Sequence, residues 1–306
     1  MRPAIDPGLA GFLEQAAAAG APPITAGSVA DARTGNAEFL RTMRTRQEPV
    51  RAVEELSVPT RAGDLPARAY LPVDEPVAVV VYLHGGGWVL GDLEGHDQLC
   101  RHLAATSGAV VVNVNYRHAP ETRFPGPAED AADAVAWAAA TYPYPVVVMG
   151  DSAGGNLAAS AAVASRDAGV RLDLQVLLYP VLDADLTRES YRRNGDGYLL
   201  TAADMDWFWD HYVGDGDRFD PRASVLRVDD LDGLAPAVVL VAGYDPLHDE
   251  GIAYADRLAA AGVPCDVLEY PGAIHGFMTL HAVSPLGEQA AEEVAGLVRR
   301  RTTAAV

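Results

Sequence analysis

A serine between two glycines is the residue whose setting most clearly indicates chemistry. Residues 150–156 read Gly-Asp-Ser-Ala-Gly-Gly-Asn, a G-x-S-x-G pattern with Ser152 at its centre. An apolar run precedes this segment and an alanine-rich run follows it, as expected for a strand, a sharp turn and a helix. Gly150 and Gly154 leave room for the turn because they carry no Cβ. The pattern predicts a raised serine hydroxyl, and the alternative is an ordinary glycine–serine turn.

A serine hydroxyl needs a base to become a nucleophile, and the base needs a carboxylate to orient it. Among the histidines after the serine, His275 lies just past the last expected strand in a glycine-flanked loop, so it is the candidate base. Asp245 follows another expected strand and is the candidate acid, which gives the order serine, acid, histidine. Asp249 and Glu250 are weaker candidates, because they fall where the next helix should begin and where acidic residues suit the helix dipole.

Three consecutive glycines supply candidate donors for a negatively charged oxygen. Gly85, Gly86 and Gly87 follow His84, directly after an apolar run that is expected to be a buried strand. Their amides can approach a substrate without obstruction by side chains, and the amide of Ala153, next to the serine, completes such a site. We therefore expect an oxyanion hole from Gly85, Gly86, Gly87 and Ala153. The alternative is a phosphate-binding loop or a plain turn.

Strand-like and helix-like segments alternate along most of the chain. Continuous apolar strands separated by amphipathic helices are typical of a parallel sheet that helices cover on both faces. A turn composition at 60–64 joins the first two strands into a hairpin, which adds antiparallel strands at one edge. Residues 1–50 and about 183–228 show no strand pattern. The expected strands are 53–58, 65–71, 77–83, 110–114, 146–149, 174–178, 237–242 and 265–270.

Composition limits the classes of partner. The chain has 306 residues, of which 49% are hydrophobic, so it can bury a large core. A net charge of −19 disfavours nucleic acid and anionic membrane surfaces as partners. No apolar run is long enough to span a membrane and no secretory signal is recognisable, so a cytoplasmic protein is expected. Cys100 and Cys265 lack the spacing of a metal site or a disulfide framework, so we expect packed cysteines and neither metal nor cofactor.

Together, the motifs resemble those of the hormone-sensitive-lipase-like bacterial esterases, also called family IV carboxylesterases. The resemblance implies an α/β-hydrolase fold with a mostly parallel central sheet, helices on both faces and a helical cap. It also implies Ser152 as nucleophile, His275 as base and Asp245 as the partner of that base. The motifs that carry it are His-Gly-Gly-Gly-Trp at 84–88, Tyr-Arg-His-Ala-Pro-Glu at 116–121, Gly-Asp-Ser-Ala-Gly-Gly-Asn at 150–156, Asp-Pro-Leu at 245–247 and His-Gly-Phe at 275–277.

The resemblance also implies roles around the triad. The amides of Gly86, Gly87 and Ala153 would bind the oxyanion, while Gly85 and His84 would shape the loop. Arg117 and Glu121 would support the site. The sequence departs from the family at His118, where leucine is more frequent, and at His248, where arginine is frequent.

Family members have a cap made from the N-terminus and an insertion. By resemblance, residues 1–50 would form the N-terminal cap segment and residues 51–306 the catalytic domain, with the insertion at about 183–228. Its aromatic residues would line the acyl pocket or hold the cap in place, and ordinary core packing is an equal alternative. Trp88 is the stronger candidate for substrate contact. The candidate substrate-binding residues are Trp88, Trp207 and Tyr212, and the further aromatic residues considered are Phe208 and Trp209.

These observations predict a serine hydrolase that cleaves short- to medium-chain carboxylic esters through an acyl-enzyme intermediate. One alternative is an amidase or a deacetylase that acts on an acetylated natural product with the same triad. The other is a non-catalytic small-molecule receptor on the same fold, which is disfavoured because the serine, the acid and the histidine are all present. The expected partner is a small-molecule ester, with a homodimer as a possibility.

Overall fold

An eight-stranded sheet forms the centre of the protein. The structure, a computed structural model, describes residues 2–20 and 23–303. The predicted segments 1–50 and 51–306 also include residues 1, 21–22 and 304–306, which lie outside the described residues. The strand order is β1-β2-β4-β3-β5-β6-β7-β8. The strands are β1 (Ala52–Thr60), β2 (Gly63–Leu71), β3 (Val79–Leu83), β4 (Val110–Val114), β5 (Val146–Asp151), β6 (Leu174–Leu178), β7 (Ala237–Tyr244) and β8 (Cys265–Ile274).

The sheet is parallel except at one edge. Strands β1 and β2 form an antiparallel hairpin, and β2 runs antiparallel to β4. All pairs from β4 through β3 to β8 are parallel. Strand β8 extends to Ile274, four residues beyond the expected end, because it pairs with Tyr244 past an irregularity in β7. The predicted fold class, a mostly parallel sheet with an antiparallel hairpin, is confirmed.

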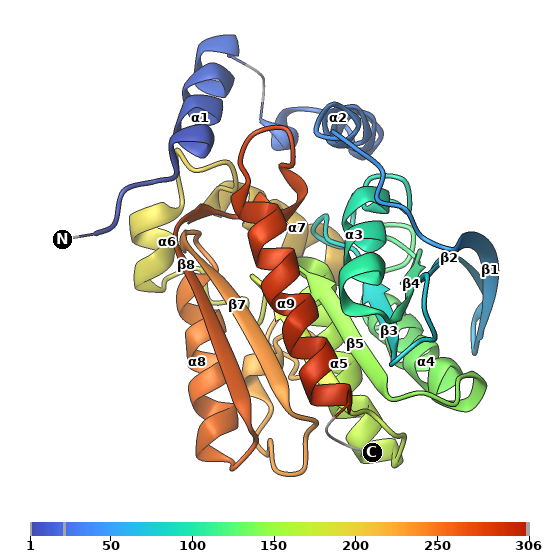
Figure 1. Cartoon of the computed structure of the whole chain (residues 1–306). Coiled ribbons are helices and arrows are strands. Elements are labelled where there is room, and N and C mark those ends of the chain that lie inside the picture. Colours follow the sequence, from blue (N-terminus) through green and yellow to red (C-terminus); the bar gives the residue numbers. More distant parts are fainter. Residues whose placement is uncertain (1, 21–22, 304–306) are drawn as a thin grey trace.

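Helices cover both faces of the sheet. Alternate residues of each strand point to opposite faces, so Val79 and Val81 join one apolar cluster while Val80 and Tyr82 join the other. Figure 1 shows α3 and α9 on one face, and α4, α5 and α8 contribute to the cluster on the other face. These helices are α3 (Asp97–Ser107), α4 (Gly126–Thr141), α5 (Ala153–Ala168), α8 (His248–Ala260) and α9 (Leu286–Thr303).

The two segments without a strand pattern are helical. Their described residues contain no strand, and Figure 1 shows those of their helices that it labels gathered at the end of the sheet where the loop between β8 and α9 emerges. Helices α2 and α7 begin at capping boxes, in which Ser28 pairs with Asp31 and Thr201 with Asp204. The helices are α1 (Pro7–Ala19), η1 (Ile24–Ala26) and α2 (Val29–Thr42) in the first segment, and α6 (Glu189–Asn194), α7 (Ala202–Val213) and η2 (Val225–Arg227) in the second.

Candidate active site

Ser152 occupies a strained turn between β5 and α5. Its backbone angles are φ 56° and ψ −119°, which are unfavourable for a residue with a side chain. A Cβ on Gly150 would overlap the carbonyl of Gly154, and a Cβ on Gly154 would overlap the carbonyl of Leu83 at the end of β3. The two glycines therefore allow the close packing that the turn requires. The serine is followed at once by the helix, so its hydroxyl lies near unpaired amides of the first turn.

The structure brings the three predicted triad side chains together. His275 follows β8, and its Nε2 lies 2.8 Å from Ser152 Oγ. Its Nδ1 lies 2.7 Å from Oδ2 of Asp245, which follows β7. Asp245 is fully buried, and its other oxygen accepts the amide of Leu247 at 2.8 Å. A carboxylate in this position keeps the proton on Nδ1, so that Nε2 can accept the serine proton.

The loop that carries the acid is held by helix α6, which sequence reasoning missed. Asn194 is fully buried, and its amide donates to the carbonyl oxygen of Asp245 at 2.9 Å. Ser190 donates its hydroxyl to the carbonyl oxygen of Pro246 at 2.6 Å. These residues lie some 50 positions before the acid in the chain, and only their polarity within a helical segment could have drawn attention to them.

The two alternative acids are engaged elsewhere. Asp249 accepts the amide of Ser190 at 2.8 Å. Glu250 is fully buried on α8 and accepts the amides of Leu182 and Asp183 at 3.2 and 2.7 Å. Both carboxylates therefore tie the start of the 183–228 segment to α8, and Asp245 alone of the three pairs with the imidazole of His275.

The triple-glycine loop lies beside the serine, but its three amides are not equivalent. The amide of Gly85 donates to Asp151 Oδ1 at 2.8 Å. Within the part of the chain that the structure describes, the amides of Gly86 and Gly87 donate to no protein group, and Ala153 is the first residue of α5, where an amide has no acceptor inside its helix. Gly85 thus departs from the prediction that it is a donor: its N–H is already used, and it fixes the loop instead.

The aromatic residues near the site are mainly packing residues. Trp88 and Tyr212 have no exposed surface, and their rings stack at 4.2 Å with an interplanar angle of 6°. Neither presents a surface to a substrate, which departs from the expectation for both. Trp207 is partly exposed and its ring lies 4.1 Å from that of His211. Phe208, by contrast, lies directly against the loop, because a Cβ on Gly87 would overlap its ring.

Charged residues around the loop tie it to neighbouring helices. Arg33 of α2 donates to Glu121 and to the carbonyl oxygens of Val89 and Ala119. The paired Arg33 guanidinium lowers the pKa of Glu121 to about 2. Arg117 forms a bidentate pair with the fully buried Asp130 of α4. Arg117 and Glu121 therefore hold the segment after β4 in place without reaching the triad.

The two departures from the family pattern lie on opposite sides of the site. His118 packs edge-on against His84 at 5.2 Å, and burial and the nearby His84 lower its pKa to about 3. His248 pairs with Asp249 at 2.9 Å and lines a cavity of about 290 Å³ together with Arg2 and Arg193. That cavity lies behind the acid loop, and Ser152 is not among its lining residues.

The described residues hold no group of three histidines, cysteines or carboxylates arranged for a metal ion. Both cysteines are free, with Cys100 buried and Cys265 half-buried. Among the described helices, none has the length and apolar character to cross a membrane.

Comparison with known proteins places the chain among bacterial esterases. A family profile described as alpha/beta hydrolase fold matches residues 80–279. Ethyl acetate hydrolase from Pseudomonas putida is 43% identical over 246 residues, covering 76% of this chain and 77% of that protein. Carboxylesterase NlhH from Mycobacterium tuberculosis is 38% identical over 267 residues, covering 82% and 84%.

Solved structures agree over nearly the whole chain. The ester-hydrolase EH1AB1 from the Lake Arreo metagenome matches with a TM-score of 0.92 at 37% identity, covering 97% of this chain and 98% of that one. A thermostable esterase from Pseudomonas putida ECU1011 matches with a TM-score of 0.94 at 34% identity, covering 99% of both chains. The expected resemblance is confirmed, and the chain belongs to the hormone-sensitive-lipase-like family of α/β-hydrolases.

Proposed function

We propose that this protein is a serine carboxylesterase that cleaves short- to medium-chain carboxylic esters through an acyl-enzyme intermediate. The observation that carries the proposal is the imidazole of His275, which bridges Ser152 Oγ and the Asp245 carboxylate at 2.8 and 2.7 Å. Relatives named ethyl acetate hydrolase and carboxylesterase support an ester as the bond that is cleaved. A nucleophile, a base and oxyanion donors are the groups that acyl transfer through a serine requires.

The reaction begins when Ser152 Oγ attacks the ester carbonyl carbon and His275 Nε2 takes the serine proton. The carbonyl oxygen becomes an oxyanion, which the amides of Gly86, Gly87 and Ala153 stabilise. As the bond to the alcohol breaks, His275 gives its proton to the leaving alkoxide, and the acyl group stays on the serine. A water then loses its proton to the same imidazole and attacks the acyl carbon. As the bond between Ser152 Oγ and the acyl carbon breaks, the imidazole returns this proton to Oγ, which releases the acid and restores the serine.

We propose that the segments 1–50 and 183–228 form the cap and that their described helices limit the length of the acyl chain. Phe208 of α7 packs against Gly87, so the second segment closes directly over one side of the oxyanion loop. Arg33 of α2 fastens the first segment to the chain next to the same loop. A cap fixed at these points leaves little depth for a long acyl chain.

Substitution of Ser152 by alanine tests the nucleophile. We expect kcat/KM for p-nitrophenyl acetate to fall by at least about 10⁴-fold with the melting temperature nearly unchanged, since the acyl-enzyme cannot form. A fluorophosphonate probe should label the wild-type protein on the peptide that contains residue 152 and should leave the variant unlabelled. Retained turnover in the variant would contradict the proposal.

Matched pairs of p-nitrophenyl esters and nitroanilides distinguish the esterase from an amidase or deacetylase. Equal rates on ester and anilide would favour the amidase, and no turnover of either with intact probe labelling would favour another acyl donor. A cytoplasmic location and a homodimer remain predictions, to be tested by cell fractionation and by light scattering of the purified protein.

A further inference from the structure

Beneath the oxyanion loop lies a buried imidazole that the mechanism above does not use. His96 is 3% exposed and its Nε2 lies 3.5 Å from Asp151 Oδ1. Its Nδ1 lies 3.4 Å from the carbonyl oxygen of Asp92. Both ring nitrogens therefore face oxygens that can only accept hydrogen bonds. An imidazole with two such neighbours is best satisfied when both nitrogens carry protons, which is the cationic form.

The partner of His96 is the residue directly before the nucleophile. Asp151 Oδ1 accepts the hydroxyl of Tyr82 at 2.7 Å and the amide of Gly85 at 2.8 Å, so its neighbours favour an ionised carboxylate. Burial raises the pKa of Asp151, but His96 and the two donors outweigh it, and the pKa is lowered. Burial likewise opposes the charge on His96, but Asp151 and Asp92 outweigh it, and the pKa of His96 is raised.

His96 belongs to a cluster of three imidazoles with His84 and His118, and the other two are neutral. His84 lies 5.4 Å from His96, ring to ring, and burial and the charge of His96 lower its pKa to about 4. His118, on the far side of His84, has its pKa lowered to about 3. One positive charge is therefore placed in this cluster, at the imidazole that faces Asp151.

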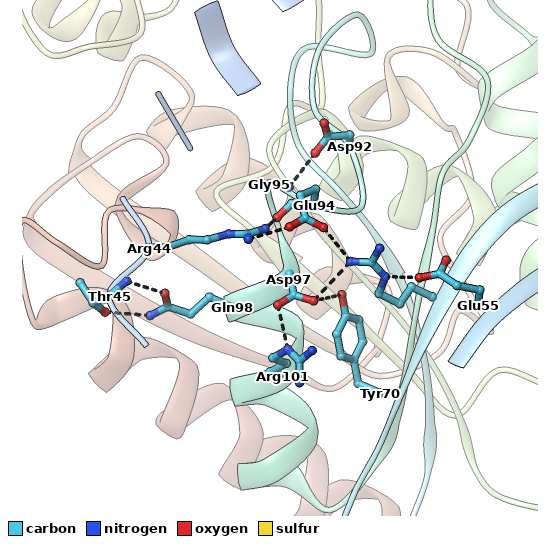
Figure 2. Close-up of polar contacts among 11 residues, drawn as sticks. Arg44, Thr45, Glu55, Tyr70, Asp92, Glu94, Gly95, Asp97, Gln98 and Arg101 are labelled. Atoms are coloured by element: carbon cyan, nitrogen blue, oxygen red, sulfur yellow. Dashed lines mark hydrogen bonds and ion pairs between the residues drawn. The ribbon is translucent and has the colours of Figure 1, made fainter. Parts of the chain in front are cut away.

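The segment that presents His96 is firmly anchored. Figure 2 shows Asp92, Glu94, Gly95 and Asp97 of this segment, with Asp97 reaching the hydroxyl of Tyr70. Asp97 pairs with Arg101 of α3 at 2.7 Å and with Arg68 of β2 at 3.4 Å. Glu94 pairs with Arg44, in the chain after α2, at 2.7 Å and with Arg68 at 3.0 Å. Within the segment, the amide of Gly95 donates to Asp92 at 2.6 Å. The residues on both sides of His96 are therefore fixed by this network, which holds its backbone beside Asp151.

We propose that His96 is a positioning residue for the oxyanion loop, acting as an imidazolium whose charge neutralises Asp151 and so keeps the Gly85 amide and the adjoining donors in place. The inference rests on the proposed esterase function. An unpaired carboxylate next to the nucleophile would oppose the negative charge that develops on the substrate oxygen. With the imidazolium present, the carboxylate serves as an anchor for Gly85 at no such cost.

The charge of His96 makes this anchor depend on pH. Because the pKa of His96 is raised above its ordinary value of 6.5, the charged pair is complete below that ordinary value and is lost as the pH rises through the raised pKa. Once His96 has lost its proton, none of the groups that face it from other elements supplies a positive charge in its place. They are Asp151 of β5, Tyr82 of β3, His84 of the following loop, Asp92 of the preceding loop and His281 after β8, while Cys100 lies on its own helix.

The test compares kcat/KM for p-nitrophenyl acetate from pH 6 to 10 in wild type and His96→Gln. Loss of one oxyanion donor costs about 10²–10³ in rate, and a displaced donor should cost less, so we expect a loss of roughly 10- to 100-fold at pH 6, mainly in kcat. The wild-type curve should fall at alkaline pH and approach the variant's curve, which has no such limb. Parallel curves, or a loss of less than about twofold, would overturn the proposal.

His102→Gln is the matched control. His102, on α3, is also buried, and one of its ring nitrogens, Nδ1, lies 3.5 Å from the carboxylate of Glu48, but it does not reach the oxyanion loop. This variant should keep the alkaline limb and stay within about threefold of wild type, because a merely structural histidine does not alter the pH profile. The same loss in both variants would assign the effect to helix packing and contradict the proposal.

A second variant, at Asp151, distinguishes loss of the charge pair from misfolding of the His96 variant. Asp151→Asn keeps an oxygen acceptor for Tyr82 and Gly85 but carries no charge, so it should lack the alkaline limb even if His96→Gln does not fold. In the Asp151→Asn background, His96→Gln should cost less than about threefold, and an undiminished cost would overturn the proposal. Fluorophosphonate labelling of Ser152 reports the esterase function separately. Intact labelling with an unchanged pH profile rejects this inference alone, whereas absent labelling in wild type rejects the proposed function.

Discussion

Two loops converge on Ser152, and they are supported in different ways. The acid loop after β7 is held by uncharged hydrogen bonds from Asn194 and Ser190 on helix α6. The oxyanion loop after β3 is held by the carboxylate of Asp151, which is itself paired with a buried imidazole. The first support depends on uncharged side chains of a helix that is distant in sequence. The second lies in the centre of the sheet and depends on charge. Substitutions on the oxyanion side should therefore change the pH profile of activity, whereas substitutions in the helix that holds the acid loop should lower activity without changing that profile.

The largest effect is expected on the acid side. Asp245→Asn should lower kcat by about 10⁴-fold, because an amide no longer favours the proton on Nδ1 of His275. The fold should be retained, since the side-chain oxygen of the substituted asparagine can still accept the amide of Leu247. Steady-state kinetics with a thermal melt as control measure both quantities. A loss of less than tenfold would indicate that another carboxylate orients the base.

On the oxyanion side, Gly85→Ala should cost about 10²–10³ in kcat/KM, comparable to the loss of an oxyanion donor. A Cβ at this position would overlap the carboxylate of Asp151 and so displace the loop. Gly35→Ala in α2 is the control, because a Cβ there meets no atom within 4 Å and the helix should tolerate it. Equal activity of the two variants would show that the loop is less constrained than its contacts indicate.

A smaller effect is expected from the helix that holds the acid loop. Asn194→Ala removes the hydrogen bond to the carbonyl oxygen of Asp245, which is worth about 1 kcal/mol, and should lower kcat/KM by about fivefold with an unchanged pH profile. Arg192→Ala, on the exposed side of the same helix, should leave activity unaltered. A pH profile that changes in the Asn194 variant would remove the distinction between the two supports.

The last effect concerns folding stability rather than activity, and it comes from a histidine on the oxyanion side. The pKa of His118 is about 3 in the folded protein and about 6.5 when unfolded, so below pH 6.5 the unfolded state binds the proton more readily. Folding stability is thus lost as the pH falls from about 6.5 toward about 3. His118→Leu should remove this contribution, which amounts to about 2 kcal/mol at pH 5. Urea unfolding at pH 5 and pH 8 measures the difference. An equal stability change at both pH values would contradict it.

The features encoded locally were predictable from sequence. The glycines around Ser152, the glycine run at 85–87 and the loops that carry Asp245 and His275 all follow apolar strands, so the parallel topology alone brings them to one edge. The topology and the fold class followed from the same alternation.

Contacts that depend on side-chain direction or on the path of the 183–228 segment were not predictable. Trp88 adjoins the oxyanion loop in sequence, but its positive φ of 61° turns the ring into the core, where Tyr212 stacks on it. Asn194 reaches the carbonyl oxygen of Asp245 only because the chain brings helix α6 next to the loop after β7. His96 belongs to none of the motifs recognised in the sequence, and its proposed role follows only from the contact between its imidazole and the Asp151 carboxylate in the structure.

The contact between Gly87 and Phe208 links two parts of the chain that are 121 positions apart in numbering (208 − 87). Helix α7 closes directly on the main chain of the loop, since no side chain at 87 keeps it away. An alanine at 87 would overlap the ring at 208 and would also have to adopt a positive φ of 60°, which is unfavourable for a residue with a side chain. We therefore expect position 87 to remain glycine among relatives, and exchange of the ring at 208 alone offers a way to enlarge the space above the loop without altering the sheet.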